Sequence, residues 1–239
     1  MSVLHLMILS SGDNIDPYWN DVSLLIRGDT LTDLSGNHTI INNGVTAGDT
    51  TYFKHSTSGS MSFNGSSDFI SIPDDASLEL GSDDFTVECW AYHDGNMTNG
   101  EYVYFAGKTD LESNRTPFVF GTTIASGGSA PMRFIVVTSS TYYTTQDTAD
   151  FPTSQWVHVA GTRSGNTITL WINGVAKATA TMSGAAVDNS HPLYIGKHAT
   201  TMPLGAVPWK GNIEDFRLTP GVARYTSNFT PPTKSFPIL

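Results

Sequence analysis

The stretch WVHVAGTRSGNTITLWINGVAKATAT, residues 156–181, contains the clearest strand and turn signals in the chain. The character of the side chains alternates from one residue to the next in residues 156–163 and again in residues 167–172. This is the two-residue period of a β-strand whose two faces differ. Ser164-Gly165-Asn166 forms a turn between these runs, and Asn173-Gly174 supplies the two positive φ angles that a tight type I′ hairpin requires. The stretch therefore predicts a meander of three antiparallel strands.

Strand signals of the same kind recur on both sides of this meander. In FTVECWAY, which begins at Phe85, Phe85 and Cys89 share one apolar face, whereas Glu88 and Trp90 share the other. A dozen or more short strands, with no convincing helix, predict an all-β fold: an antiparallel β-sandwich of two sheets in a single domain. Beyond the meander and this run, we predict strands at residues 22–27, 39–41, 60–63, 69–72, 102–107, 118–121, 133–139, 193–196 and 211–218.

The chain shows one domain and three long connections. We assign residues 16–239 to the domain and residues 1–15 to an N-terminal arm. The connections at residues 93–101, 124–132 and 199–208 are longer than a hairpin demands. Long loops on a rigid sandwich are common positions for binding, so we expect function there.

Composition excludes several classes of function. The chain has 239 residues, 12 Lys and Arg against 22 Asp and Glu, a net charge of −10 and one cysteine. Its cations are scattered, and an acidic surface without a basic stripe predicts no binding to nucleic acid. No stretch has the ~18 consecutive apolar residues of a membrane span, so we expect no membrane insertion. The short apolar run at the start follows no Lys or Arg, so we expect no signal peptide.

Several blocks of the chain resemble, in order, the concanavalin A-like, laminin-G-like jelly-roll domains. The resemblance covers the chain from residue 16 onward and implies a jelly-roll sandwich. The blocks are Asp33-Leu-Ser-Gly36, Ser62-Phe-Asn-Gly65 with Phe69-Ile-Ser-Ile-Pro73, Asp84-Phe-Thr-Val-Glu-Cys-Trp90, Trp156-Val-His-Val-Ala160, Leu170-Trp-Ile-Asn-Gly174, Leu193-Tyr-Ile-Gly196 and Gly211-Asn-Ile-Glu-Asp-Phe-Arg217.

Two end blocks narrow this resemblance. Asp16-Pro-Tyr-Trp-Asn-Asp-Val-Ser-Leu-Leu25 and Ala223-Arg-Tyr-Thr-Ser-Asn-Phe-Thr-Pro-Pro232 look like the ends of such domains in bacteriophage structural and tail-associated proteins. The resemblance implies a virion component, made in the host cytoplasm, that decorates a capsid or belongs to a tail. Its implied partners are other virion proteins and further copies of the same chain in a homo-oligomer.

Glucanases have the same fold, so the sequence could contain catalytic groups. Retaining glycoside hydrolysis uses two carboxyl groups roughly 5–5.5 Å apart, and the glucanase relatives carry a Glu-x-Asp-x-Glu strand that this chain lacks. The nearest spacing, Asp110-Leu-Glu112, is interpreted as a loop, and the adjacent Glu214 and Asp215 point to opposite faces of a regular strand. We interpret Cys89 and His158 as buried structural residues. We therefore predict that the protein is not an enzyme.

A calcium site is implied by the resemblance. Jelly-roll relatives often connect an early Asp-x-Ser-Gly loop to an acidic pair on a late strand, and calcium takes six to eight oxygen ligands. The matching positions are Asp33, with Asn37 nearby, and Glu214 with Asp215. The alternative is that Asp33 caps a turn while Glu214 is solvated or pairs with Arg217.

Sugar binding requires an exposed aromatic ring flanked by polar groups. Trp209 and the pair Tyr142-Tyr143 are the candidate carbohydrate-binding residues, although each ring could equally cover the core or meet a neighbouring subunit. The first hypothesis is a non-enzymatic virion protein that also binds surface polysaccharide. The alternatives are a stand-alone, extracellular, calcium-dependent carbohydrate-binding module and a glycoside hydrolase.

Overall fold

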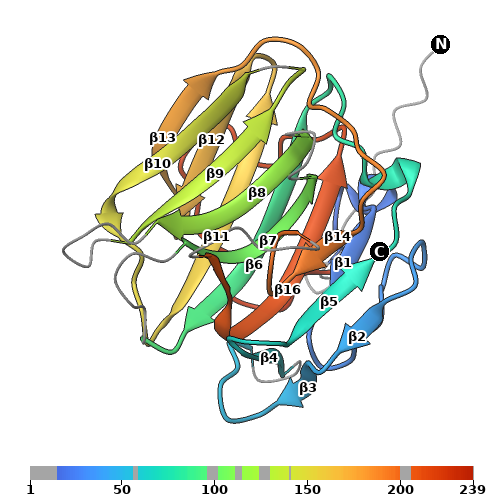
Figure 1. The fold of residues 1–239 in the computed structure, drawn as a ribbon, viewed down its shortest axis with the longest axis vertical. Coiled ribbons are helices and arrows are strands. Elements are labelled where there is room, and N and C mark those ends of the chain that lie inside the picture. The colour runs from blue at the N-terminus through green and yellow to red at the C-terminus, as the bar shows by residue number, and fades with distance from the viewer. Residues whose placement is uncertain are drawn as a thin grey trace.

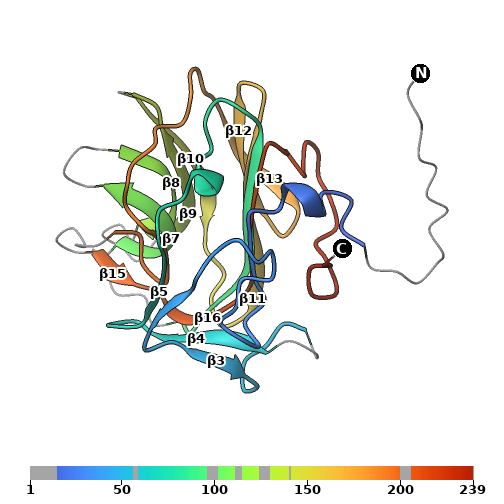
Figure 2. The same ribbon diagram turned by 90° about the vertical axis from the view of Figure 1, so that its right-hand side faces the viewer.

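The computed structural model describes residues 15–55, 59–95, 102–110, 115–123, 130–139, 141–199 and 206–238. These residues form sixteen strands and two short 3₁₀ helices, η1 (Trp19–Asp21) and η2 (Ala76–Leu78). The strands build two sheets of eight strands each, stacked face to face (Figures 1 and 2). The predicted all-β sandwich is thus confirmed, whereas nearly all of the predicted arm lies outside the described residues.

Sheet A contains the meander and the last long strand of the chain. Every pair of neighbours in it is antiparallel, and β1 (Leu24–Ile26) pairs with β16 beside the main path. Its order is β13 (Val175–Thr181), β12 (Thr167–Ile172), β11 (Trp156–Ser164), β6 (Phe85–His93), β16 (Lys210–Pro220), β4 (Ser60–Asn64) and β3 (Thr46–Asp49).

Sheet B lies across the core from sheet A (Figure 2). Its neighbours are antiparallel except for β15 (Ala206–Pro208), which pairs in parallel with β7. Its order is β10 (Tyr142–Asp150), β9 (Pro131–Val137), β8 (Arg115–Thr123), β7 (Tyr102–Asp110), β14 (Leu193–Ile195), β5 (Phe69–Ile72) and β2 (Ile41–Asn43).

The predicted hairpin between β12 and β13 is confirmed in detail. Asn173 and Gly174 have φ angles of 50° and 75°, as a two-residue type I′ turn demands. A Cβ atom on Gly174 would lie 1.9 Å from the carbonyl oxygen of Phe229, so the close approach of the C-terminal residues also depends on glycine.

The core lies between the sheets and consists of the side chains that point inward from alternate positions along the strands. Phe120 stacks on Phe105 and Phe134, with ring centroids 5.2 and 4.6 Å apart. The Phe134 ring reaches sheet A, where a Cβ on Gly161 would be 2.7 Å from it. Each such side chain contributes roughly 1.5–3 kcal/mol through burial, so the packing holds both sheets rigid.

The first and last described segments of the chain cover the outer face of sheet A. The N-terminal segment, residues 15–23, and the C-terminal tail, residues 221–238, run over the same side of the sandwich (Figure 2). Glu88 and Trp90, on the face of β6 that turns away from the core, are 1% and 4% exposed beneath them. β6 is therefore buried on both faces, although its sequence alternation predicts only one apolar face.

Some predicted elements are shifted and others are new. Strands β3, β10 and β15 have no counterpart in the sequence prediction, and Asp110 ends strand β7 where we expected a loop. Glu112 and parts of the three long connections lie outside the described residues. Within the described ranges, no helix is long and apolar enough to cross a membrane.

Candidate functional site

Trp209 lies at the junction of β15 and β16 with 0% of its surface exposed. Its backbone N–H donates to the carbonyl of Gly196 at 2.7 Å, which directs the ring between the sheets. There the ring meets the rings of His93 and Phe105 at centroid distances of 4.8 and 5.4 Å. Sugar stacking needs an exposed ring face, so the prediction of Trp209 as a carbohydrate-binding residue is wrong. The ring covers the core instead.

Tyr142 and Tyr143 are not one platform. Successive side chains of a strand point to opposite faces, and in β10 Tyr142 is 54% exposed on the outer face of sheet B. Tyr143 points the other way, and its hydroxyl lies 3.0 Å from Oγ of Ser183. The two predicted residues therefore belong to different surfaces.

Tyr143 forms a wall of an open groove of about 440 Å³. We call it the Tyr143 groove; its lining residues are Thr138, Ser139, Thr141, Tyr143, Ser183, Gly184, Ala185, Ala186 and Val187. The turn from β9 to β10 forms one side, closed by a bond from the Thr138 N–H to the Thr141 carbonyl at 3.0 Å. The segment after β13 forms the other side, anchored by a bond from the Val187 N–H to the Val137 carbonyl at 2.9 Å.

The chemistry of the Tyr143 groove is neutral and rich in hydroxyl groups. Its lining combines one aromatic ring with Ser and Thr side chains and small apolar residues, and none of these residues carries a charge. Hydrogen bonds with Ser183 lower the pKa of Tyr143. A ring and hydroxyl groups side by side can stack on and hydrogen-bond a sugar, whereas these lining residues include no carboxyl or imidazole group for acid–base catalysis.

Asp33 organises the loop after β1 by accepting hydrogen bonds from its own neighbourhood. Its Oδ1 accepts from the N–H groups of Leu25 and Ser35, both at 3.0 Å, and its Oδ2 from those of Asn37 and His38 at 3.0 and 2.9 Å. These donors occupy the lone pairs that a cation would use. The predicted joint metal site of Asp33 and Asn37 with Glu214 and Asp215 is therefore wrong, and Asp33 caps a turn.

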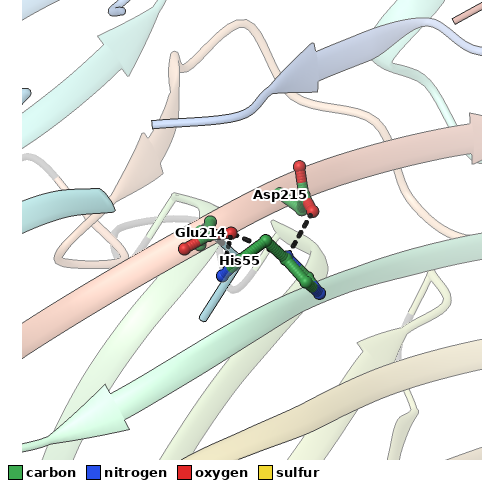
Figure 3. Close-up of side chains that lie close together, drawn as sticks. All are labelled: His55, Glu214 and Asp215. Atoms are coloured by element: carbon green, nitrogen blue, oxygen red, sulfur yellow. Dashed lines mark hydrogen bonds and ion pairs between the residues drawn. The ribbon is translucent and has the colours of Figure 1, made fainter. Parts of the chain in front are cut away.

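Glu214 and Asp215 meet His55 instead (Figure 3). His55 Nδ1 lies 2.7 Å from Glu214 Oε1 and 3.4 Å from Asp215 Oδ2. A regular strand would separate the two carboxylates, but β16 has a register shift here and Asp215 has a φ of 54°. This bulge places both acids on the same side of the strand, contrary to the sequence prediction.

His55 supplies the positive charge of this cluster. Burial lowers its pKa, but the hydrogen bonds with Asp215 and Glu214 and their negative charges outweigh burial and raise the pKa to about 9. Burial also raises the pKa of Asp215, and the charge of Glu214 adds to that increase. A protonated His55 thus faces two buried acids at neutral pH.

The cluster does not fit the calcium ion that the fold family implies. Calcium requires oxygen ligands, yet Glu214 accepts from the backbone N–H groups of Lys54 and His55, at 2.7 and 3.1 Å, as well as contacting the imidazole. These donors occupy the lone pairs of Glu214, and Asp215 Oδ1, the carboxylate oxygen of the cluster without a hydrogen bond, is far short of the six to eight oxygen ligands that calcium takes. Both alternatives for Glu214 are also wrong, because it is fully buried and because Arg217 bonds to Glu88 and Asp16.

A buried charged network under the chain ends escaped prediction. Glu88 accepts from Arg217 at 2.7 Å, from Tyr225 at 2.8 Å and contacts His158 at 3.1 Å. Burial opposes ionisation of Glu88, but the charge of Arg217 outweighs it and holds the pKa well below its usual range. The structural interpretations of His158 and of Cys89, which is 1% exposed, are confirmed. The network connects the N-terminal segment and the C-terminal tail to sheet A, because Asp16 bonds to Arg217 and Arg224 while Tyr225 bonds to Glu88.

The chain resembles a known protein family in sequence and solved structures in fold. The profile of the concanavalin A-like lectin/glucanases superfamily matches residues 64–223. No curated protein sequence matches the chain. Domain 4 of a GH43 extracellular arabinanase from Geobacillus stearothermophilus, solved with arabinotriose, is 21% identical with a TM-score of 0.60, covering 84% of this chain and 92% of the domain.

Toxin binding domains are similar as well. The binding domain of botulinum neurotoxin serotype D is 15% identical with a TM-score of 0.64 over 85% of this chain and 49% of its own. The binding domain of Paraclostridial Mosquitocidal Protein 1 is 15% identical with a TM-score of 0.61 over 87% and 50%. This chain therefore spans about half of each toxin domain, and at these identities the likeness establishes the fold.

Proposed function

Because the chain belongs to the concanavalin A-like lectin/glucanase superfamily, we propose that it is a non-enzymatic module that binds carbohydrate. The observation that carries the proposal is the Tyr143 groove, where an aromatic ring and several hydroxyl groups line one uncharged depression. The arabinanase domain was solved with arabinotriose, and a serotype D neurotoxin domain with N-acetylneuraminic acid, so similar sandwiches hold sugars.

The outer face of sheet B supports a function without catalysis. A retaining hydrolase of this fold places paired carboxyl groups on a strand face. Strands β8 and β9, which lie between β10 and β7 in sheet B, contain no Asp or Glu. Glu214 and Asp215, which do lie close to each other, are buried on the other sheet and bonded to His55.

A glycan array with purified protein tests the proposal, with and without chelator. We expect saturable binding that chelator does not remove, and a loss of affinity of about tenfold or more in Tyr143→Ala, because one stacking ring contributes on the order of 1–2 kcal/mol. Tyr18→Ala is the matched control, since Tyr18 is an exposed tyrosine on the N-terminal segment. Binding that Tyr143→Ala leaves unchanged would exclude the groove, and an array without signal would exclude the function.

We propose further that this module is a component of a phage particle, decorating a capsid or a tail. The support is the resemblance of the two end blocks, which meet in the fold where Arg224 Nη1 bonds to Asp16 Oδ1 at 2.8 Å. The proposed partners are other virion proteins and copies of the same chain. Mass spectrometry of purified particles should detect the protein, and native mass measurement should give an oligomer. A monomer found only outside particles would contradict this role.

A further inference from the structure

The outer face of sheet B carries a row of four residues in direct register. Phe120 and Phe134 point into the core and are fully buried, so their neighbours Gly121 and Arg133 point outward. Gln146 of β10 pairs with Arg133, Arg133 with Gly121, and Gly121 with Tyr104 of β7. We call Gln146, Arg133, Gly121 and Tyr104 the Arg133 row; its strands face the viewer in Figure 1.

Glycine in this row makes room for an aromatic ring beside the arginine. A Cβ on Gly121 would lie 2.4 Å from Cδ1 of Tyr104, so the tyrosine ring occupies the space above the glycine. His198 stacks on Tyr104 with ring centroids 3.7 Å apart and fixes its orientation. Tyr102, two residues earlier on the same face, is parallel to Tyr104 and 40% exposed. The row is therefore a preorganised surface rather than a loose patch.

Arg133 is positioned to receive an anion from solution. Its Nε donates to Gln146 Oε1 at 2.5 Å, which orients the guanidinium and leaves both terminal nitrogens for a further partner. No described carboxylate lies within ion-pair distance of Arg133, whereas Arg217 and Arg224 both bond to Asp16. In a chain of net charge −10, a partly exposed arginine held in this way is the feature that a ligand carboxylate would recognise in bidentate geometry.

Aromatic rings lie on both sides of the row. Tyr102 pairs with Thr123 on one side of the Arg133 row, whereas Tyr142 pairs with Val137 on the other side of the row. Tyr142 and Gln146 are four residues apart on β10, about 13 Å at the usual rise of a strand. A face with a central cation and a ring at each side suits a chain of sugar units better than a single sugar.

We infer that the outer face of sheet B binds an acidic oligosaccharide, with the carboxylate of a uronic or sialic acid unit on Arg133 and neighbouring units on Tyr102 and Tyr142. The inference rests on the proposed carbohydrate-binding function and adds the class of ligand. It concerns a different surface from the Tyr143 groove, so the two are separable by mutation.

The test compares acidic glycans with their neutral methyl esters, so that only the charge differs. The probes are immobilised oligogalacturonates and sialylated oligosaccharides, each beside its methyl ester. Wild type should prefer the acidic form by about tenfold or more, and the preference should weaken as salt increases. Arg133→Gln should abolish the preference, whereas Arg133→Lys, which keeps the charge without the planar fork, should retain part of it.

Controls separate this inference from the proposed function. Tyr18→Ala, on the N-terminal segment and in neither proposed surface, should leave the ratio of acidic to neutral binding unchanged. Equal binding of both forms by wild type, or a preference that survives in Arg133→Gln, overturns the acidic site while carbohydrate binding stands. Absence of binding to any glycan overturns both. Thermal unfolding of each variant verifies its fold, and Gln146→Ala provides a second variant that perturbs Arg133 without removing it.

Discussion

Asp215 shows how much one residue can change the chemistry of a strand. Its positive φ and the bulge around it bring two acids to a single imidazole, where a regular strand would have separated them. The result is an internal ion cluster that joins the loop before β4 to the centre of sheet A. The positive charge on His55 is therefore part of the stability of the fold.

The first prediction concerns the pH dependence of this cluster. The pKa of His55 is raised from 6.5 to about 9 in the folded protein, so its contribution is fully present below pH 6.5 and is lost as pH rises through 9. The free energy of unfolding should fall across this range by on the order of 2 kcal/mol, allowing for partial screening. Urea titrations of His55→Gln should show a flatter profile. Identical profiles in both proteins would refute a role for the His55 charge.

Some of this residue-scale detail was accessible from sequence. Ile213 and Phe216 both enter the core although three positions separate them, and two inward apolar residues at that spacing signal a bulge in a strand. His55 had no such signal, because only tertiary packing brings it to β16. Trp209 and Tyr142-Tyr143 were predicted to bind carbohydrate because they are aromatic. The residue type alone does not show whether a side chain is buried or which face of the sheet it lies on.

At the scale of elements, turn chemistry was the most informative signal. Asn173-Gly174 fixed the hairpin from β12 to β13, because few residues tolerate two consecutive positive φ angles. Strand β10 had no comparable signal. Its inward Thr145 and Asp147 are polar, so its sequence lacks the apolar alternation that marks the other long strands.

The second prediction separates the two roles of Gly174. Gly174→Ala should destabilise the protein by about 2–4 kcal/mol, because the added Cβ meets the carbonyl of Phe229 as well as straining the turn. Gly165→Ala is the matched control, since Gly165 has a φ of 58° with no atom within 4 Å of the added Cβ, and it should cost about 1 kcal/mol. Equal losses in chemical denaturation would show that the tail contact contributes nothing.

For the whole molecule, stability depends on charges within the chain. Asp33 is saturated by N–H donors, and the imidazole of His55 lies between Glu214 and Asp215. At these residues, a calcium ion would find only one carboxylate oxygen without a hydrogen bond, Asp215 Oδ1. The jelly-roll sandwich was predictable because periodic strands and turn residues agree along the chain, whereas the burial of β6 on both faces depends on distant ends that no local pattern reveals.

The third prediction follows from these internal contacts. Scanning calorimetry should give the same Tm with excess calcium chloride as with excess EDTA, because a ligand shifts Tm only if it binds the folded state. Magnesium chloride at equal ionic strength is the control for screening. A Tm that rises with calcium concentration alone would demonstrate a bound ion and refute the assignment of His55 as the cation of the cluster.

The described terminal segments, residues 15–23 and 221–238, lie on the outer face of sheet A, and the Arg133 row lies on the opposite surface of the sandwich (Figure 2). Anything that tethers the protein through either end would therefore hold it with sheet B directed away from the support. Many copies fixed in that orientation would display their sheet B faces in parallel, and weak individual contacts would then add up to firm adhesion on a repetitive polymer.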